Sequence, residues 1–230
     1  MKKKIKDKIT IVIPTKNEQE TIAEVIKQCK KYANQIIVVD GHSIDKTRSI
    51  AKSLGVKVIL DNKKGKGDAI RKSLEYVNNE IIVFIDADGS HETKDIPELV
   101  EPLFKNKAEL VVASRLKGGS DEIKLDLNGL IRHIGGELSV IIVNYRWGVD
   151  LTDIHNGFRA IKKKAILGLN LKSNGFEIEE EIIMKCLKKG YNVLEIASHE
   201  YARKGGISKL QTRQAGKILF KLFLEVFNFN

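Results

Sequence analysis

The chain of 230 residues has few of the side chains that build disulfide scaffolds and structural zinc sites, because it contains two cysteines. Cys29 and Cys186 stand singly and no CxxC pair is present, so we expect both to be buried free thiols. No apolar run approaches the ~18 residues that a transmembrane helix needs. The lysine-rich start MKKKIKDK is not followed by a long apolar stretch, so it does not resemble a secretory signal.

Two common nucleotide-binding motifs are also missing. Gly65-Lys66-Gly67 lacks the upstream glycine and the following Ser or Thr of a phosphate-binding P-loop. No GxGxxG follows the first apolar run, which spans residues 9–13. These absences disfavour ATPases and dinucleotide-dependent dehydrogenases.

Positive charge is concentrated at the two ends of the chain. The net charge is +10, of which residues 1–8 carry +4 and residues 201–230 carry +5, so the long middle part is nearly neutral. Basic ends suggest an anionic partner, such as a phospholipid surface, a phosphorylated substrate or nucleic acid. Because the basic residues are not interleaved with aromatic ones, we expect no nucleic-acid partner.

Short apolar runs alternate with helical patterns, which predicts an α/β protein. The runs are at 9–13, 36–40, 56–60, 81–86 and 109–114, with helices expected at 19–33, 45–54, 66–78 and 95–106. Strands that are apolar on both faces and separated by helices indicate a mostly parallel sheet covered on both sides. Further along, we expect an amphipathic helix at 127–146, strands at 158–161 and 191–197, and a helix at 177–189.

Polar side chains follow several of the predicted strands at the point where each one ends. In parallel sheets, ligands bind at the carboxyl ends of the strands, so these residues are candidates for one site. Asp86 and Asp88 are two carboxylates at i and i+2, which point the same way on an extended chain. This spacing suits two oxygen ligands of a divalent cation that neutralises a leaving diphosphate.

Several segments together resemble glycosyltransferase family 2. The segments are PTKNE at 14–18, VVDGHSIDKT at 38–47, KGKGDAIR at 64–71 and the Asp86-Ala87-Asp88 motif. A second set is similar to the dolichyl-phosphate mannose synthase branch of that family: DADGSH at 86–91, Ser114-Arg115, Asp153 with NGFRA at 156–160, GFEIE at 175–179 and RKGGISKL at 203–210. The resemblance covers residues 9–212. It implies a GT-A type fold, with a catalytic domain at 1–210 and a C-terminal amphipathic helix at 211–230.

The resemblance implies an inverting, metal-dependent transfer of a hexose from a nucleotide sugar to a polyprenyl (dolichyl) phosphate. The product would be a lipid-linked sugar donor for glycan or protein glycosylation. Lys16, Gly41 and Ser90 stand where the family or branch commonly has Tyr, Asp and Gln, so the donor stays open between GDP-mannose and UDP-glucose or UDP-GlcNAc. The alternative is a family 2 enzyme with a soluble or glycan hydroxyl acceptor.

The resemblance also assigns roles to individual residues. Mg²⁺ or Mn²⁺ would be held by Asp86 and Asp88, and the catalytic set adds Arg115, Arg132, Asp153 and Arg203. The donor would contact Pro14, Asn17, Glu18, Asp40, Lys66, Arg71, Ala87 and Lys209, and the acceptor would contact Arg115, Arg132, Arg159 and Ser208. Asp153 is expected to orient an arginine or a sugar hydroxyl. His91 could reach the metal or the diphosphate, or it could pack against the strand end.

A lipid acceptor implies work at a membrane surface. Residues 211–227 place Lys217, Lys221 and Glu225 on one stripe of an otherwise apolar helix. Such a helix either lies in the interface of an anionic membrane or docks on the protein. We expect a peripheral protein on the cytoplasmic face, with a small membrane-anchoring protein as a further candidate partner.

Overall fold

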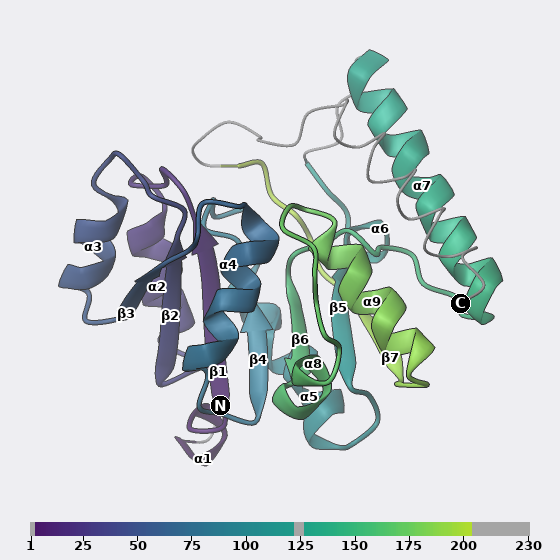
Figure 1. Ribbon diagram of the computed structural model, residues 1–230, viewed down its shortest axis with the longest axis horizontal. Helices are drawn as coiled ribbons and strands as arrows, with labels where there is room; N and C mark the ends of the chain where they lie inside the picture. Colours follow the sequence, from purple (N-terminus) through teal and green to yellow (C-terminus); the bar gives the residue numbers. More distant parts are fainter. Residues whose placement is uncertain (1–2, 122–126, 204–230) are drawn as a thin grey trace.

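The computed structural model describes residues 3–121 and 127–203, which form one α/β unit around a seven-stranded sheet (Figure 1). The strand order is β3-β2-β1-β4-β6-β5-β7. The strands are β1 (Ile9–Thr15), β2 (Gln35–Asp40), β3 (Lys57–Leu60), β4 (Ile81–Phe84), β5 (Leu110–Ser114), β6 (Arg159–Lys162) and β7 (Val193–Ala197). The helices are α1 (Lys3–Lys6), α2 (Ile22–Cys29), α3 (Thr47–Ser53), α4 (Lys66–Ser73), α5 (Ile96–Phe104), α6 (Arg115–Gly118), α7 (Leu127–Trp147), α8 (Lys163–Leu167) and α9 (Ile178–Lys188), with short 3₁₀ turns at Leu74–Tyr76 and Thr93–Asp95.

The sheet is parallel except for one strand. β1 pairs in parallel with β2 and β4, β2 with β3, and β5 with β7. β6 lies antiparallel between β4 and β5. The predicted α/β fold with a mostly parallel sheet is therefore confirmed, and the antiparallel insertion of β6 is a feature that the sequence did not predict.

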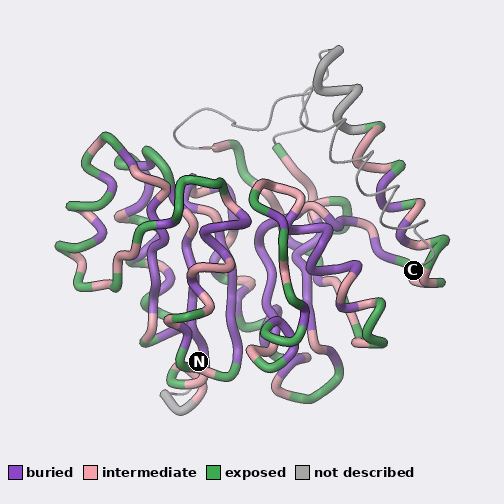
Figure 2. The backbone as a smooth tube through the Cα atoms, in the orientation of Figure 1, coloured by how far each residue is buried: buried purple, intermediate pink, exposed green. Residues whose placement is uncertain are grey.

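Two apolar cores lie on the two faces of the sheet, and strands β1, β2, β4, β5 and β6 are mostly buried, whereas the edge strands β3 and β7 are partly exposed (Figure 2). In β1, Ile9, Ile11 and Ile13 face the core under α2 and α5, whereas Val12 faces the core under α4 and α9. Because alternate residues of a strand point to opposite faces, a strand covered on both sides must be apolar at every position. The two cysteines are buried free thiols, one in each core.

The predicted elements match the observed ones with shifted ends. The helix expected at 66–78 is α-helical to Ser73 and continues as a 3₁₀ turn to Tyr76. The amphipathic helix expected at 127–146 is α7. No helix in the part of the chain that the structure describes is long and apolar enough to cross a membrane. The helix predicted for residues 211–230 lies outside the described residues.

Helix α7 is tied to the rest of the fold through His155. Its imidazole Nδ1 is 2.7 Å from Glu180 Oε1 on α9, and its Nε2 is 3.3 Å from the carbonyl oxygen of Gly136 on α7. Both partners are acceptors, so both ring nitrogens must donate, and the ring is an imidazolium. Burial opposes the charge, but the nearby Glu180 and Asp153 carboxylates raise the pKa of His155 above its usual value.

The start of α4 depends on a close backbone approach at Gly67. Its N–H donates to the carbonyl oxygen of Asn174, at 2.8 Å. A Cβ atom at this position would lie 2.4 Å from the Ser173 carbonyl oxygen. Glycine is therefore required here by packing, and this contact fixes the preceding residue, Lys66, against the segment that leads into α9.

We predict that Gly67→Ala destabilises the protein by about 1–3 kcal/mol, because backbone atoms cannot yield to the added methyl group. Gly135→Ala is the matched control, since a Cβ there meets nothing within 4 Å and the residue lies inside α7. Alanine favours a helix interior over glycine by about 1 kcal/mol, so this variant should be at least as stable as the wild type. Urea unfolding measures both changes, and equal stability of Gly67→Ala and the wild type would contradict the packing argument.

The His155 tether predicts a pH-dependent stability. Because the pKa of His155 is higher in the folded than in the unfolded protein, its contribution is fully present below the unfolded pKa. The contribution is lost as the pH rises through the folded pKa. The stability difference between wild type and His155→Gln should thus be larger at about pH 5.5 than at about pH 9, as measured by urea unfolding. A difference that stays constant or grows with pH would show that the imidazolium is not what holds α7.

Candidate active site

The polar residues that follow β1, β2, β4 and β5 lie at the carboxyl ends of these strands, and the register places three of the strand ends side by side. Thr15 at the end of β1 pairs with Asp40 at the end of β2, and Asp86 and Asp88 follow β4 directly. The antiparallel β6 brings the loop before it, residues 152–158, to the same edge. The candidate active site is therefore the edge formed by the carboxyl ends of the parallel strands, which we call the active edge.

Asp86 is held by a buried lysine. Lys66 Nζ lies 2.7 Å from Asp86 Oδ1 and 2.9 Å from Glu179 Oε1, at the start of α9. Burial alone would lower the pKa of Lys66, but the two carboxylates raise it well above its usual value. Burial likewise opposes the charge on Asp86, yet Lys66 and His91 bring the pKa of Asp86 far below its usual range. Both groups are therefore ions at neutral pH.

Arg159, which we predicted to contact the acceptor, lies inside the protein. Its side chain is fully buried on β6 and pairs with Glu179 at 3.4 Å. Its Nε donates to the Asn156 carbonyl oxygen at 2.9 Å, and its Nη1 donates to the Glu179 carbonyl oxygen at 2.8 Å. The guanidinium donates its hydrogen bonds to internal acceptors, so Arg159 holds the loop before β6 to α9. Because the side chain is fully buried, it is not exposed to a phosphate.

Asp88 is held by a second cation. Its Oδ1 accepts hydrogen bonds from the backbone N–H and the hydroxyl of Ser90, at 3.1 and 2.8 Å. Its Oδ2 is 3.1 Å from Arg203 Nη2. Ser90 also accepts a backbone hydrogen bond from Tyr201, at 2.8 Å, which keeps the segment before Arg203 beside the acidic pair.

Arg115 and Asp153 form a two-pronged ion pair next to this cluster. Arg115 Nε lies 2.7 Å from Asp153 Oδ2, and its Nη2 lies 2.9 Å from Oδ1. Burial disfavours both charges, but the pair raises the pKa of Arg115 and lowers that of Asp153. The Arg115 side chain remains 31% exposed, and its Nη1 lies 3.6 Å from Glu200 Oε1, so Asp153 fixes one side of the guanidinium while the other side faces a second carboxylate and solvent.

The predicted donor residues around β1 and β2 form a hydrogen-bonded turn. Asn17 has a positive φ of 56°, and its N–H donates to Ser43 Oγ at 2.8 Å. The fully buried Asp40 accepts from the Ser43 N–H through Oδ1, whereas its Oδ2 has no hydrogen-bond partner among the described residues. Glu18 is buried next to this turn, and its N–H donates to Thr47 Oγ1. An unpartnered buried carboxylate oxygen marks a place where a ligand donor group would be accepted.

Other predicted residues lie at different places. Pro14 is in β1 opposite Val39, and Ala87 is buried between the two aspartates. Arg71 Nη1 donates to the Lys172 carbonyl oxygen at 2.8 Å, so its guanidinium is engaged by the segment before α9. Arg132 is on α7, and its side chain is outside the described set; Ser208 and Lys209 lie outside the described residues altogether.

His91 packs against the end of β4, next to Asp86. Its Nε2 is 3.5 Å from Asp86 Oδ2, and its ring stacks on Phe158 with the centroids 5.2 Å apart. Sequence reasoning gave no role to Glu179, Glu180 or Glu195, although all three carboxylates bind residues of this edge. Three consecutive glutamates at 179–181, buried at the start of α9, were a signal that charged partners would be found there.

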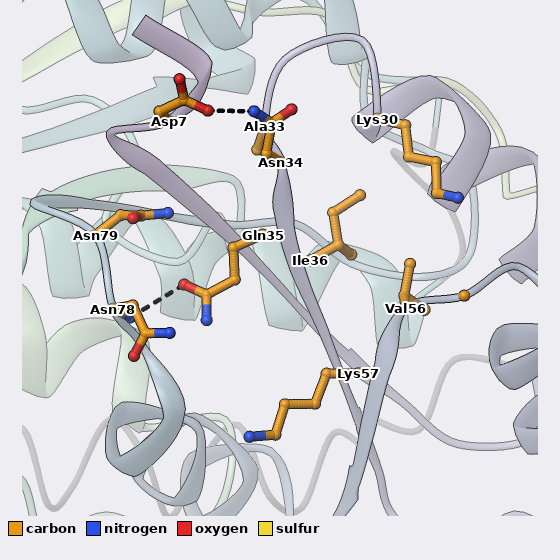
Figure 3. A pocket seen from close by; sticks show the side chains of 11 residues that line it. Asp7, Lys30, Ala33, Asn34, Gln35, Ile36, Val56, Lys57, Asn78 and Asn79 are labelled. Atoms are coloured by element: carbon orange, nitrogen blue, oxygen red, sulfur yellow. Dashed lines mark hydrogen bonds between the residues drawn. The ribbon is translucent and has the colours of Figure 1, made fainter. Parts of the chain in front are cut away.

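Cavities lie at both ends of the strands in the described part of the protein. One of about 280 Å³ is lined by residues that include Asp86, His91 and Tyr201. A larger one of about 600 Å³ lies at the opposite edge of the sheet, where Asp7 bonds Asn34 and Asn78 bonds Gln35 (Figure 3). The larger cavity contains a single carboxylate, which is already bonded, so its size does not make it the active site.

Comparison with known proteins identifies related glycosyltransferases. The family profile "Glycosyl transferase family 2" matches residues 10–168. Glycosyltransferase AglJ of Haloferax volcanii is 31% identical over 218 residues, which cover 93% of this chain and 70% of the relative. Dolichol-phosphate mannosyltransferase of Pyrococcus furiosus is 31% identical over 235 residues, which cover 96% of this chain and 63% of that protein.

A solved structure has the same fold. Glucosyl-3-phosphoglycerate synthase from Mycobacterium tuberculosis, in complex with Mn²⁺, UDP and glucosyl-3-phosphoglycerate, superposes with a TM-score of 0.74. The two proteins are 19% identical, and the alignment covers 97% of this chain and 81% of the other. The family match spans β1 to α8 and includes the acidic pair, Arg115 and Asp153, and from it we conclude that this chain belongs to glycosyltransferase family 2.

Proposed function

We propose that the protein transfers a hexose, with inversion, from a nucleotide sugar to a polyprenyl phosphate and so makes a lipid-linked sugar. The observation that carries this proposal is the pairing of Asp153 with Arg115. Both oxygens of Asp153 accept hydrogen bonds from Arg115, and Oδ1 also accepts from the His155 and Asn156 N–H groups. A carboxylate used in this way, with a lowered pKa, is a poor general base.

An acceptor that is already an anion needs no such base. A phosphate monoester is ionised at neutral pH, and what it requires is orientation towards the anomeric carbon. Arg115, which is held by Asp153 and partly exposed, supplies a fixed, planar guanidinium for phosphate oxygens, which would take the place of the longer 3.6 Å contact with Glu200. The name of the Pyrococcus furiosus relative, a dolichol-phosphate mannosyltransferase, supports an acceptor of this class.

The acidic pair fits a divalent cation that is shared with the donor. Within the described residues no group of three or more His, Cys, Asp or Glu side chains is placed to hold a metal. Mg²⁺ is commonly held by one or two carboxylates together with substrate phosphates, so Asp86 and Asp88 suffice when a nucleoside diphosphate is bound. The cation, Mg²⁺ or Mn²⁺, would neutralise charge on the leaving diphosphate. The comparison structure contains Mn²⁺ and UDP.

The remaining residues bind and orient the donor. Asp40 offers its unpartnered Oδ2 to a base or ribose donor group, next to Asn17 and Glu18. Lys66 fixes the position of Asp86 through their ion pair. Arg203 is paired with Asp88 and lies close enough to the acidic pair to contact a diphosphate oxygen. Either a guanine or a uracil nucleotide is compatible with these contacts, so the donor is proposed as GDP-mannose, UDP-glucose or UDP-GlcNAc.

A soluble acceptor is the second candidate, and it is suggested by the name of the enzyme in the comparison structure. That enzyme is a glucosyl-3-phosphoglycerate synthase, whose product is water-soluble. Its fold likeness does not extend to the acceptor, because the sequence identity is 19%. The stripe of exposed apolar residues Ile134, Leu138, Ile141 and Tyr145 on α7 is more easily explained by a lipid substrate than by a soluble one.

The two candidates are separated by an acceptor panel. Purified protein is incubated with Mg²⁺ or Mn²⁺, each of several GDP- and UDP-sugars, and either a short polyprenyl phosphate or 3-phosphoglycerate. We expect label to move into the organic phase with one donor and the polyprenyl phosphate. Label transferred to 3-phosphoglycerate alone would replace the proposal with the soluble alternative.

We predict that Asp88→Asn removes most of the transfer activity, at least about a hundredfold, because one of two metal-binding carboxylates is lost and Arg203 loses its partner. Asp86→Asn should act in the same way. Asp150→Asn is the control, since it removes an exposed carboxylate near the same loop. Initial rates at saturating donor measure the effect. Activity of Asp88→Asn within twofold of the control would contradict the role of the acidic pair.

The protein is proposed to work as a peripheral protein on the cytoplasmic face of an anionic membrane. The basic segment 201–230 and the predicted helix 211–230 would supply the contact, with about 1 kcal/mol for each basic residue near the surface. The two alternatives for this helix are that it lies in the membrane interface or that it docks on the catalytic domain at 1–210. A small membrane-anchoring protein is a further candidate partner.

We expect that deleting residues 211–230 leaves the unfolding midpoint and nucleotide binding unchanged while it abolishes binding to anionic liposomes. Transfer to liposome-embedded acceptor should fall with it, because the lipid substrate cannot reach the site through water. A docked helix would instead give an aggregated or unfolded truncation. A folded truncation that still glycosylates the embedded acceptor at the full rate would contradict both versions.

A further inference from the structure

Glu195 lies on the edge strand β7, yet its side chain is only 1% exposed. Its Oε1 accepts hydrogen bonds from two consecutive backbone N–H groups, those of Thr152 and Asp153, both at 2.8 Å. Its Oε2 accepts from the Thr152 hydroxyl at 2.8 Å and pairs with Lys117 Nζ at 2.9 Å. Both oxygens of this carboxylate thus bind groups beside the active site, in the loop before β6 and in α6.

The first consequence concerns Asp153. Two adjacent amides bound to a single oxygen fix the peptide plane between residues 152 and 153, and with it the direction of the Asp153 side chain. Asp153 in turn accepts hydrogen bonds from Arg115 Nε, Nη2 and backbone N–H. The position of the Arg115 guanidinium therefore depends on a carboxylate that never touches it.

A second route reaches Arg115 through hydroxyl groups. The single hydroxyl proton of Thr152 goes to Glu195, so Thr152 Oγ1 can only accept from Ser114 Oγ, which is 2.6 Å away. Ser114 Oγ is then left as an acceptor, and it receives the Lys117 N–H at 3.2 Å as the N-cap of α6. Helix α6 begins at Arg115, so this chain fixes its backbone as well.

We propose that Glu195 is a positioning residue for transfer, which holds Arg115 in place for the acceptor phosphate through Asp153 and through the α6 cap. This inference rests on the proposed function of Arg115. Lys117 supplies the compensating charge that makes a buried carboxylate tolerable at the sheet edge. A carboxylate is required because an amide offers one acceptor oxygen in place of two and would reverse the proton direction along Thr152 and Ser114.

The test compares Glu195→Gln with Glu109→Gln. Glu109 precedes β5 at the other end of the same strand pair, where it accepts from the Asn192 N–H at 3.0 Å and pairs with Lys162 at 3.2 Å, far from the acidic pair. With the acceptor that the wild type uses, Glu195→Gln should lower kcat/KM for the acceptor about tenfold and leave the donor KM unchanged. Glu109→Gln should change neither. Equal effects of the two variants would reduce Glu195 to a structural residue.

A double-mutant cycle shows whether the effect passes through Arg115. Arg115→Lys keeps the charge but loses the two-pronged contact with Asp153. In that background, Glu195→Gln should lower kcat/KM by less than about twofold, because the geometry it protects is already gone. Multiplicative effects of the two changes would overturn the proposal. Thr152→Val removes only the hydroxyl chain, so it should lower kcat/KM for the acceptor by less than Glu195→Gln does. It replaces Glu195→Gln in the test if that variant does not fold.

A spectroscopic measurement separates this inference from the proposed function. The ¹⁵N–¹H signal of Arg115 Nε, assigned by its absence in Arg115→Lys, should be protected from exchange in the wild type and in Glu109→Gln. In Glu195→Gln it should exchange faster by about tenfold or more. If the wild type transfers no sugar to polyprenyl phosphate, the proposed function fails while this result still stands. Unchanged exchange in Glu195→Gln would overturn the positioning role whatever the acceptor.

Discussion

The need to balance buried carboxylates with cations organises the active edge of this protein. Asp86 pairs with Lys66 at 2.7 Å, Asp88 with Arg203 at 3.1 Å and Asp153 with Arg115 at 2.7 Å. Each cation comes from a different part of the chain, and an unpaired charge at such a place would cost several kcal/mol. The pairs therefore force α4, α6, the loop before β6 and the segment after β7 to meet at the end of β4. The parallel sheet brings the carboxyl ends of the strands together, and the ion pairs hold these loops against them.

These pairs also prepare the site for anionic substrates. Arginine and lysine side chains held on carboxylates keep their charge and a fixed direction, which is what a phosphate or diphosphate group requires. The same pairs leave the carboxylates with little capacity to accept a proton. Under the proposed function, the site contributes binding and orientation, the acceptor contributes its own negative charge, and a shared cation balances the leaving group.

Sequence patterns were sufficient for the architecture and for the place of the acidic pair at the carboxyl end of β4. Apolar runs ending in Asp40, Asp86 and Ser114–Arg115 predicted strands whose carboxyl ends form a site, because strand period and turn position are local properties. The direction of β6 could not be read locally, since a four-residue strand looks the same in either orientation. The burial of Arg159 could not be read locally for a related reason: its partners, the carbonyl oxygens of Asn156 and Glu179, are brought together by tertiary packing. Glu195 carried no motif at all, and its partner Thr152 is separated from it by 43 positions.

Joint binding of a metal by Asp86, Asp88 and the donor diphosphate is central to the proposed function, and Mn²⁺ binding followed by electron paramagnetic resonance tests it most directly. Two carboxylates already engaged by Lys66 and Arg203 should bind Mn²⁺ weakly in the protein alone. Addition of GDP or UDP should tighten Mn²⁺ binding by about tenfold or more beyond the binding of Mn²⁺ to the nucleotide itself, and Asp88→Asn should abolish the increase. Mn²⁺ binding that is equally tight without a nucleotide, or an increase that survives Asp88→Asn, would contradict the account.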